Sequence, residues 1–288
     1  MPLIITCAVL LAMGVVVTII WWRERFVAPL TPFTRPSGSD GSNSGSLRHV
    51  DGLRLYAWWA AVFMVIGTAT GILITGAGGR LTMRLLAMTS PEATGRLTEA
   101  SASVGEISLE GTFTLLLFGA LPFSFASAAL YLLVVPWLPS GALGGVLLGA
   151  VMFVTVSPFV DPLRADNIDF LIVGPGWLAI IAFALLSLLQ GAALAAIAGR
   201  LSRSLHLMTR RNWPQTVAPL LLSIVLFPIG AVLALGGLTT FALPRLLPWF
   251  LDIRASRTGV VVGRVMLALA VVAALPAFVG AVVSIWGR

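Results

Sequence analysis

Arginines and glutamates gather in one polar segment of an otherwise apolar chain, residues 76–112. Arg80 and Arg84 are four residues apart, so on a helix they share one face. Three glutamates follow at spacings of seven and four, and they would also share a face if that stretch is helical: Glu99, Glu106 and Glu110. The spacing predicts an interfacial ion-pair cluster between two antiparallel helices, with the arginines also contacting lipid phosphates. The alternative is a gate or an anionic-ligand site, because the planar guanidinium donates two parallel hydrogen bonds to phosphate.

A second polar cluster, with Arg164 among it, follows an apolar run and contains three carboxylates and an amide: Asp161, Asp166, Asn167 and Asp169. Such hard oxygen ligands are the kind that bind Ca²⁺ or Mg²⁺. The string DPLRADNID lacks the DxDxDG pattern and a distal glutamate, and Arg164 offsets one charge. We therefore expect a solvated loop in which Asp166 or Asn167 caps a helix. A weak cation-binding loop is the alternative, and no metal site is predicted.

The first polar segment also carries a resemblance. Its strings GGRLTMRLLAMTSP, TGRLTEA and VGEISLEGT resemble a pattern shared by bacterial polytopic membrane proteins of unassigned function. The resemblance implies a bacterial plasma membrane as the location. It implies no activity, so no functional residue is carried over from it.

The residue inventory excludes several membrane activities. The chain has no lysine, so it lacks a retinal Schiff base and a P-loop. The single cysteine, Cys7, excludes internal disulfides and CxxC pairs. The two histidines, His49 and His206, fall outside the apolar runs and no HExxH string occurs, which argues against bis-histidine haem and zinc-peptidase sites. We expect no cofactor and favour a protein that is not an enzyme.

Composition indicates that lipid is the main solvent of this chain. Of its 288 residues 58% are hydrophobic and 10% are charged, against roughly 45–50% and 25% in soluble domains. A helix needs about 20 apolar residues to cross the hydrocarbon core. Runs of that kind predict an all-α, polytopic transmembrane bundle of about seven spans, in a range of six to eight: 3–22, 55–75, 113–135, 141–160, 177–199, 216–236 and 265–286.

The chain also divides by composition. Residues 1–25 are expected to form an N-terminal transmembrane anchor, 26–54 a flexible Ser/Gly-rich linker, and 55–288 the helical bundle with its polar loop 76–112. All nine tryptophans fall at or near predicted span ends, which indicates interfacial belts. Glycine ridges within the spans predict close helix packing: Gly67/Gly71, Gly141/Gly145/Gly149 and Gly191/Ala195/Gly199.

Orientation follows from the arginines, because cytoplasmic loops carry an excess of positive charge. The acid-free stretch 200–211 favours the cytoplasm, which puts the N-terminus outside. The short apolar stretch 238–251 either continues this pattern or re-enters the membrane and turns back. The net charge of +7 is spread over membrane ends, so we expect membrane lipids and not nucleic acid as partners.

Three functions remain compatible with the sequence. The first is a non-catalytic subunit or scaffold that packs against the helices of a protein partner in a membrane complex. The second is an uncoupled transporter or channel for a small or lipid-like molecule, including an anionic one. The third is a lipid-handling membrane enzyme that uses the Arg80–Glu110 cluster. The spans contain no acidic or basic residue near their predicted centres, which argues against a charge-driven pump.

Overall fold

The computed structural model describes residues 2–29, 44–99, 102–106, 108–164 and 166–287. Within these ranges the chain forms helices and no strand, with one isolated bridge between Leu97 and Ser103. The predicted all-α fold is therefore confirmed for the described residues. The α-helices are α1 (Pro2–Ile20), α2 (Ser44–Thr70), α3 (Ala77–Met88), α4 (Leu109–Thr114), α5 (Leu121–Val134), α6 (Ala142–Thr155), α7 (Asp169–Ile172), α8 (Gly176–Ser204), α9 (Trp213–Val225), α10 (Phe227–Ala242), α11 (Leu246–Ala255) and α12 (Arg257–Trp286).

Five helices are long and apolar enough to cross a membrane: Pro2–Ile20, His49–Met88, Leu109–Trp137, Gly176–Ser204 and Arg257–Trp286. Two of them are composite. The π-helix η2 (Gly71–Gly76) joins α2 to α3, and the π-helix η4 (Leu115–Ala120) joins α4 to α5. A sixth span results if α10 and α11, which meet at a bend of 100°, count as one. Five or six long apolar helices support a membrane-embedded bundle, and the count of seven is not confirmed.

The glycine ridges pack helices of the same chain together. A Cβ added to Gly145 of α6 would lie 2.1 Å from the carbonyl oxygen of Gly191 in α8, and one on Gly149 would lie 2.3 Å from that of Ser187. Gly67 of α2 meets the ring of Phe125 in α5 in the same way. Only glycine permits such close backbone approach. Close helix packing is confirmed for Gly67, Gly71, Gly145, Gly149 and Gly191. It is not confirmed for Gly141, which precedes α6 with a φ of 76°, or for Gly199, which lies against Glu24 in the segment after α1.

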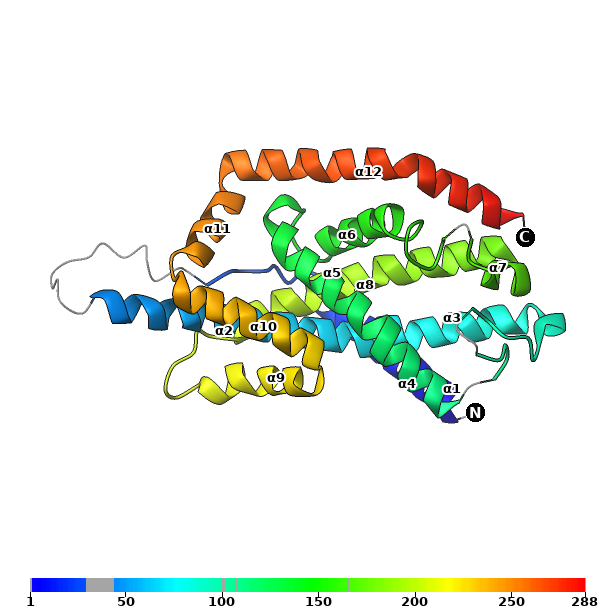
Figure 1. Cartoon of the computed structure of the whole chain (residues 1–288), viewed down its shortest axis with the longest axis horizontal. Helices are drawn as coiled ribbons and strands as arrows, with labels where there is room; N and C mark the ends of the chain where they lie inside the picture. Colours follow the sequence, from blue (N-terminus) through cyan, green and yellow to red (C-terminus); the bar gives the residue numbers. More distant parts are fainter. Residues whose placement is uncertain (1, 30–43, 100–101, 107, 165, 288) are drawn as a thin grey trace.

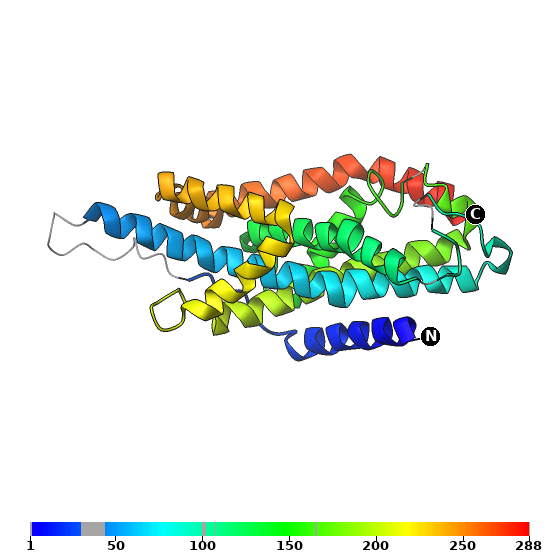
Figure 2. The same ribbon diagram turned by 60° about the horizontal axis from the view of Figure 1, so that its bottom comes forward.

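The predicted span 216–236 is wrong as one continuous helix. Leu226 leaves the helical conformation (φ −94°, ψ 63°) between α9 and α10, and α10 runs back alongside α9 (Figures 1 and 2). Pro228 in the first turn of α10 has no N–H, so it starts a helix more readily than it continues one. With 13 residues α9 is about 20 Å long, short of the roughly 30 Å hydrocarbon core. The pair forms a hairpin that packs on α2.

Most helix axes lie roughly along one long direction, from which α11 is turned by the bend of 100° after α10, so the bundle has two ends (Figure 1). The start of α1 and the end of α12 lie at one of them, with the loops around Glu99 and Asp161. The opposite end carries the segment after α1, the α8–α9 loop and α11. We call this the arginine end, because most described arginines belong to its segments: Arg23, Arg25, Arg54, Arg200, Arg203, Arg210, Arg211, Arg245, Arg254, Arg257 and Arg264.

The tryptophans of the chain are only partly interfacial. Trp58 and Trp59 of α2 are 1% and 9% exposed, and Trp58 donates from Nε1 to the carbonyl of Leu205 at 2.8 Å. Because α2 begins eleven residues before the predicted edge at 55, these two side chains lie inside the bundle, against Phe26. The belt prediction is wrong for them. Trp22, Trp177, Trp213, Trp249 and Trp286 are exposed.

The predicted linker 26–54 overlaps packed residues at both ends. At the start of the linker Val27 donates its N–H to the hydroxyl of Ser202 at 3.0 Å, just after Glu24, which pairs with Arg203 at 2.9 Å. At its end a Cβ on Gly52 of α2 would lie 3.4 Å from Pro244. The Ser/Gly-rich part of this linker, up to residue 43, lies outside the described residues. The predicted anchor α1 packs on α3, η2 and α8.

Candidate functional site

In the structure the two arginines of the first predicted cluster do not pair with its three glutamates. Arg84 in α3 donates from Nη1 to the carbonyl of Gly105 at 2.9 Å, and Arg80 lies one turn earlier, where its Nη2 would be 2.8 Å from a Cβ on Gly111. Within the described part of the chain neither arginine is in ion-pair distance of Glu99, Glu106 or Glu110. The expected Arg–Glu cluster is therefore not formed.

The reason lies in the backbone between α3 and α4. Residues 94–99 and 102–106 form turns around the bridge of Leu97 with Ser103, and Gly95 and Gly105 have positive φ of 82° and 87°. Glu99 and Glu106 consequently do not share a helix face, and only Glu110 lies on a helix, in α4. Glu106 and Glu110 are exposed.

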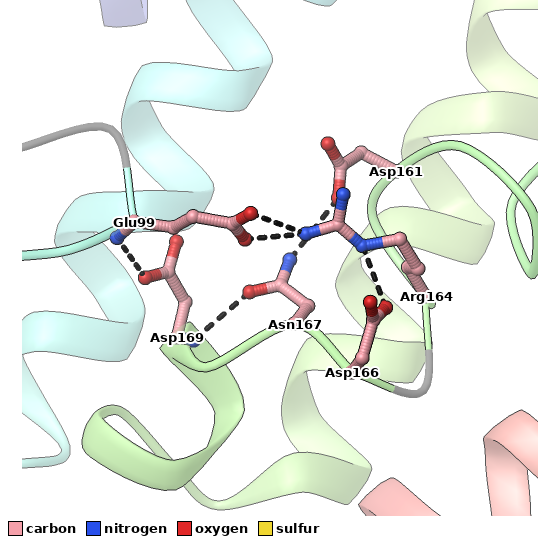
Figure 3. A network of polar contacts seen from close by, with 6 residues as sticks. All are labelled: Glu99, Asp161, Arg164, Asp166, Asn167 and Asp169. Carbon is pink, nitrogen blue, oxygen red and sulfur yellow. Dashed lines mark hydrogen bonds and ion pairs between the residues drawn. The ribbon is translucent and has the colours of Figure 1, made fainter.

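Glu99 belongs instead to the second predicted cluster (Figure 3). Its carboxylate accepts from Arg164 Nη2 at 2.5 and 2.6 Å, and its backbone N–H donates to Asp169 Oδ1 at 2.8 Å. Arg164 Nε also lies 2.8 Å from Asp166 Oδ1. The two loops that the sequence treats as separate sites are thus one network.

Asn167 organises the other half of this network. Its Nδ2 donates to Asp161 Oδ1 at 3.1 Å, and its Oδ1 accepts from the N–H of Asp169, the first residue of α7, at 2.9 Å. That bond is made one residue before the N-cap of α7, which is Ile168 and has no side-chain cap bond, so the expectation that Asp166 or Asn167 caps a helix is not confirmed. Among the residues that the structure describes, no three His, Cys, Asp or Glu side chains come together as metal ligands, so the geometry gives the cation-loop alternative no support.

Two pKa values in the network depart from their ordinary range. The hydrogen bond to Glu99 raises the pKa of Arg164, which therefore stays charged. Burial raises the pKa of Asp161, while the charge of Arg164 and the amide of Asn167 act in the opposite direction. The network joins the loop after α3 to the loop before α7 through ion pairs and hydrogen bonds.

A different polar cluster lies inside the bundle, between α2, α5 and α8. Gln190 of α8 is 2% exposed, and its Nε2 donates to the hydroxyls of Thr70 at 2.9 Å and Ser124 at 3.1 Å. The hydroxyl of Thr75 in η2 lies 3.0 Å from that of Ser124. Gln190, Thr70 and Thr75 fall within the predicted spans 177–199 and 55–75, so the sequence alone places these three polar groups in the membrane. It does not indicate Ser124 or the bonds that join the four.

Two features set this interior cluster apart from ordinary helix packing. The π-helices η2 and η4 contact each other and flank this cluster. Turns of π-helix are rare in proteins overall, and many of those that occur lie at functional sites. The Oε1 of Gln190 is buried without a hydrogen-bond partner. Gln190 lines a crevice of about 180 Å³ of empty space together with Ser127 and Ser187, and this crevice is too narrow for a water molecule.

No known protein family, curated protein or solved structure matches the chain. The functional proposals therefore rest on the geometry of the chain itself.

Proposed function

We propose that this chain is a non-catalytic, multi-pass subunit of a bacterial plasma membrane that packs α12 against a transmembrane helix of a partner protein. The observation that carries the proposal is the exposed side of α12. This 30-residue helix contacts α6 and α8, yet only 11% of its most apolar stretch is buried. An edge helix of this kind is available to a second chain.

Small residues on α12 support the proposal further. Four exposed ones are spaced three, four and three apart and so share a face: Ala270, Ala273, Ala277 and Gly280. A Cβ on Gly280 would meet nothing within 4 Å. Small residues let the backbones of transmembrane helices approach closely, which is how such helices associate in lipid. We call these four residues the α12 small-residue face.

The use of polar groups agrees with a structural role. Glu99 is bonded by Arg164, Glu24 is paired with Arg203, and the Gln190 amide is bonded by two hydroxyls. These groups hold loops and helices together, and the interior crevice has no room for substrate.

We also propose that the arginine end faces the cytoplasm. Within the described chain this end carries Arg203, Arg210, Arg211 and the other arginines of its segments, whereas the opposite end carries Arg80, Arg84, Arg96 and Arg164. Cytoplasmic loops are the ones enriched in positive charge. The start of α1 and the end of α12 then face outward.

Affinity purification of the tagged full chain from native membrane in mild detergent tests the subunit role. We expect one protein to co-purify in stoichiometric amount, and Ala277→Leu to remove it because a leucine prevents close helix approach. Ala268→Leu is the matched control, since Ala268 is exposed on α12 nine residues away, on the opposite face. Purification of a monodisperse chain without a partner, or equal loss in both variants, would overturn the proposal.

An uncoupled transporter is the second candidate, and the unpartnered Gln190 carbonyl beside two π-helices favours it. Broken helices and mid-membrane polar sites are common in transporters. Opening of the crevice between α5, α6 and α8 would then admit solute. A cysteine at Ser187 that reacts with a small maleimide only in an open state would favour transport, and complete protection under all conditions would speak against it.

A further inference from the structure

A basic hollow lies at the arginine end, between the start of α2 and the α8–α9 loop. It has about 740 Å³ of empty space, part of it open solvent, and five residues line it: Arg54, Met208, Thr209, Arg210 and Trp213. Two arginines from different parts of the chain therefore line one space.

The positive charge of this hollow is largely uncompensated. Arg54 pairs with Asp51, on its own helix, at 3.4 Å, a long contact between partly exposed groups. Arg210 has no carboxylate in ion-pair distance among the described residues. The whole stretch 198–217 contains no acidic residue. An anion is the ligand that this arrangement favours.

The loop that carries Arg210 is held in shape before any ligand arrives. Asn212 Oδ1 accepts from the N–H and the hydroxyl of Thr209 at 2.5 and 2.7 Å, and its Nδ2 donates to the carbonyl of Leu207 at 3.1 Å. Because Asn212 is engaged in the loop, its side chain does not cap α9. Pro214 has no N–H, and Gln215 donates its N–H to the carbonyl of Asn212 at 3.1 Å, so the donors that the hollow offers to an anion are its arginines.

Apolar surface continues from the hollow toward the membrane interior. Trp213 opens α9 and is 53% exposed, and Leu221 and Ile224 on the same side of this helix are 57% and 73% exposed. Indole prefers the headgroup level of a bilayer. A basic site above an exposed apolar helix face matches a molecule with an anionic head and hydrocarbon tails.

We propose that this hollow binds the phosphate headgroup of an anionic phospholipid, with Arg54 and Arg210 on the phosphate and the acyl chains along α9. Guanidinium groups bind phosphate oxygens through paired hydrogen bonds. Free phosphate would use the same arginines and leave the apolar side of α9 unused. The site is independent of the proposed partner contact on α12.

Native mass spectrometry of the full chain in an uncharged detergent, titrated with phosphatidylglycerol or phosphatidylcholine, tests the site. We expect one phosphatidylglycerol to bind more tightly than phosphatidylcholine. The double variant Arg54→Gln/Arg210→Gln should bind it about 25-fold more weakly, since each arginine near a membrane surface contributes about fivefold. The control Arg211→Gln/Arg257→Gln removes the same charge from exposed positions of the same end and should bind as the wild type does.

Three results would overturn the assignment. Equal binding of both lipids excludes headgroup selection, and equal loss in both double variants indicates general surface charge. Displacement of the lipid by inorganic phosphate at similar concentration would assign the site to free phosphate. If the pocket double variant does not fold, Arg210→Gln alone, at an exposed loop position, should still weaken binding about fivefold.

Discussion

Individual polar side chains contribute unequally to the stability of this bundle. Gln190 bonds two hydroxyls through Nε2 but leaves Oε1 buried without a partner. An unpaired buried acceptor costs free energy of about 1–3 kcal/mol. Thr70 also donates to the carbonyl of Ile66 at 2.7 Å, and Ser124 has Thr75 nearby, so both hydroxyls keep a partner without the amide.

Gln190→Leu should therefore leave the thermal midpoint in detergent unchanged or raise it, because it removes the unpaired carbonyl. Gln190→Glu should lower the midpoint, since burial of an ionised carboxylate costs several kcal/mol. Circular dichroism during heating measures both. A loss of more than about 2 kcal/mol in the leucine variant would mean that the amide bonds hold the helices together.

Asp161 makes stability depend on pH at the opposite end. Burial raises its pKa above 3.8 in the folded chain, so the folded state binds the proton more readily than the unfolded state does. Its favourable contribution is therefore present below pH 3.8 and is lost as the pH rises through the folded pKa.

Asp161→Asn should raise the free energy of unfolding at pH 7, and the gain should vanish below pH 3.8. Asparagine still accepts from the Asn167 amide. The gain should stay below about 1 kcal/mol, because water screens a half-exposed loop. Thermal unfolding across pH checks this, with exposed Asp166→Asn as control; a variant without any pH-dependent difference contradicts it.

Among the elements, the α6–α8 pair depends on direct backbone contact. Gly145 and Gly149 face Gly191 and Ser187 at distances that exclude any side chain. Because lipid provides no hydrophobic drive between helices, dispersion across this close contact holds them together. The short α6, with 14 residues, is stabilised by α8 and not by its own length.

Gly145→Ala should destabilise the bundle by about 1–3 kcal/mol, since its Cβ would lie 2.1 Å from a backbone oxygen that cannot move alone. Gly280→Ala is the matched control in open space and should be neutral or slightly stabilising. Retention of folded protein after detergent heating compares them. Equal stability of both variants would show that the helices separate without cost.

At the scale of the whole molecule, the α9–α10 hairpin determines at which end of the bundle the α8–α9 loop and the α10–α11 corner lie. A continuous helix over 216–236 would put the α8–α9 loop and the α10–α11 corner at opposite membrane faces. The hairpin brings both to the arginine end (Figures 1 and 2). Gly52 of α2 lies against Pro244 at that corner, which agrees with this arrangement.

Cysteine labelling tests the arrangement in a Cys7→Ser background. Arg211→Cys and Arg245→Cys should both react with a membrane-impermeant maleimide only after permeabilisation, because both lie at the proposed cytoplasmic end. Arg96→Cys should react in intact cells. If positions 211 and 245 are labelled from opposite sides of the membrane, residues 216–236 cross it as one continuous span and the hairpin is wrong. If all three positions show the reverse pattern, the arginine end faces outward and the proposed orientation is wrong.

The sequence alone determined the all-helical class, five of the long apolar helices and the glycine contacts, because membrane thickness and close packing impose local patterns on the chain. It did not predict the Glu99–Arg164 pair, which joins residues 65 positions apart through two irregular loops. The sequence did not predict the turn at Leu226 either, because an apolar run with a proline is compatible with a kinked span as well as with a hairpin. Packing of α9 and α10 on α2 selects the hairpin, and only the tertiary structure contains that contact.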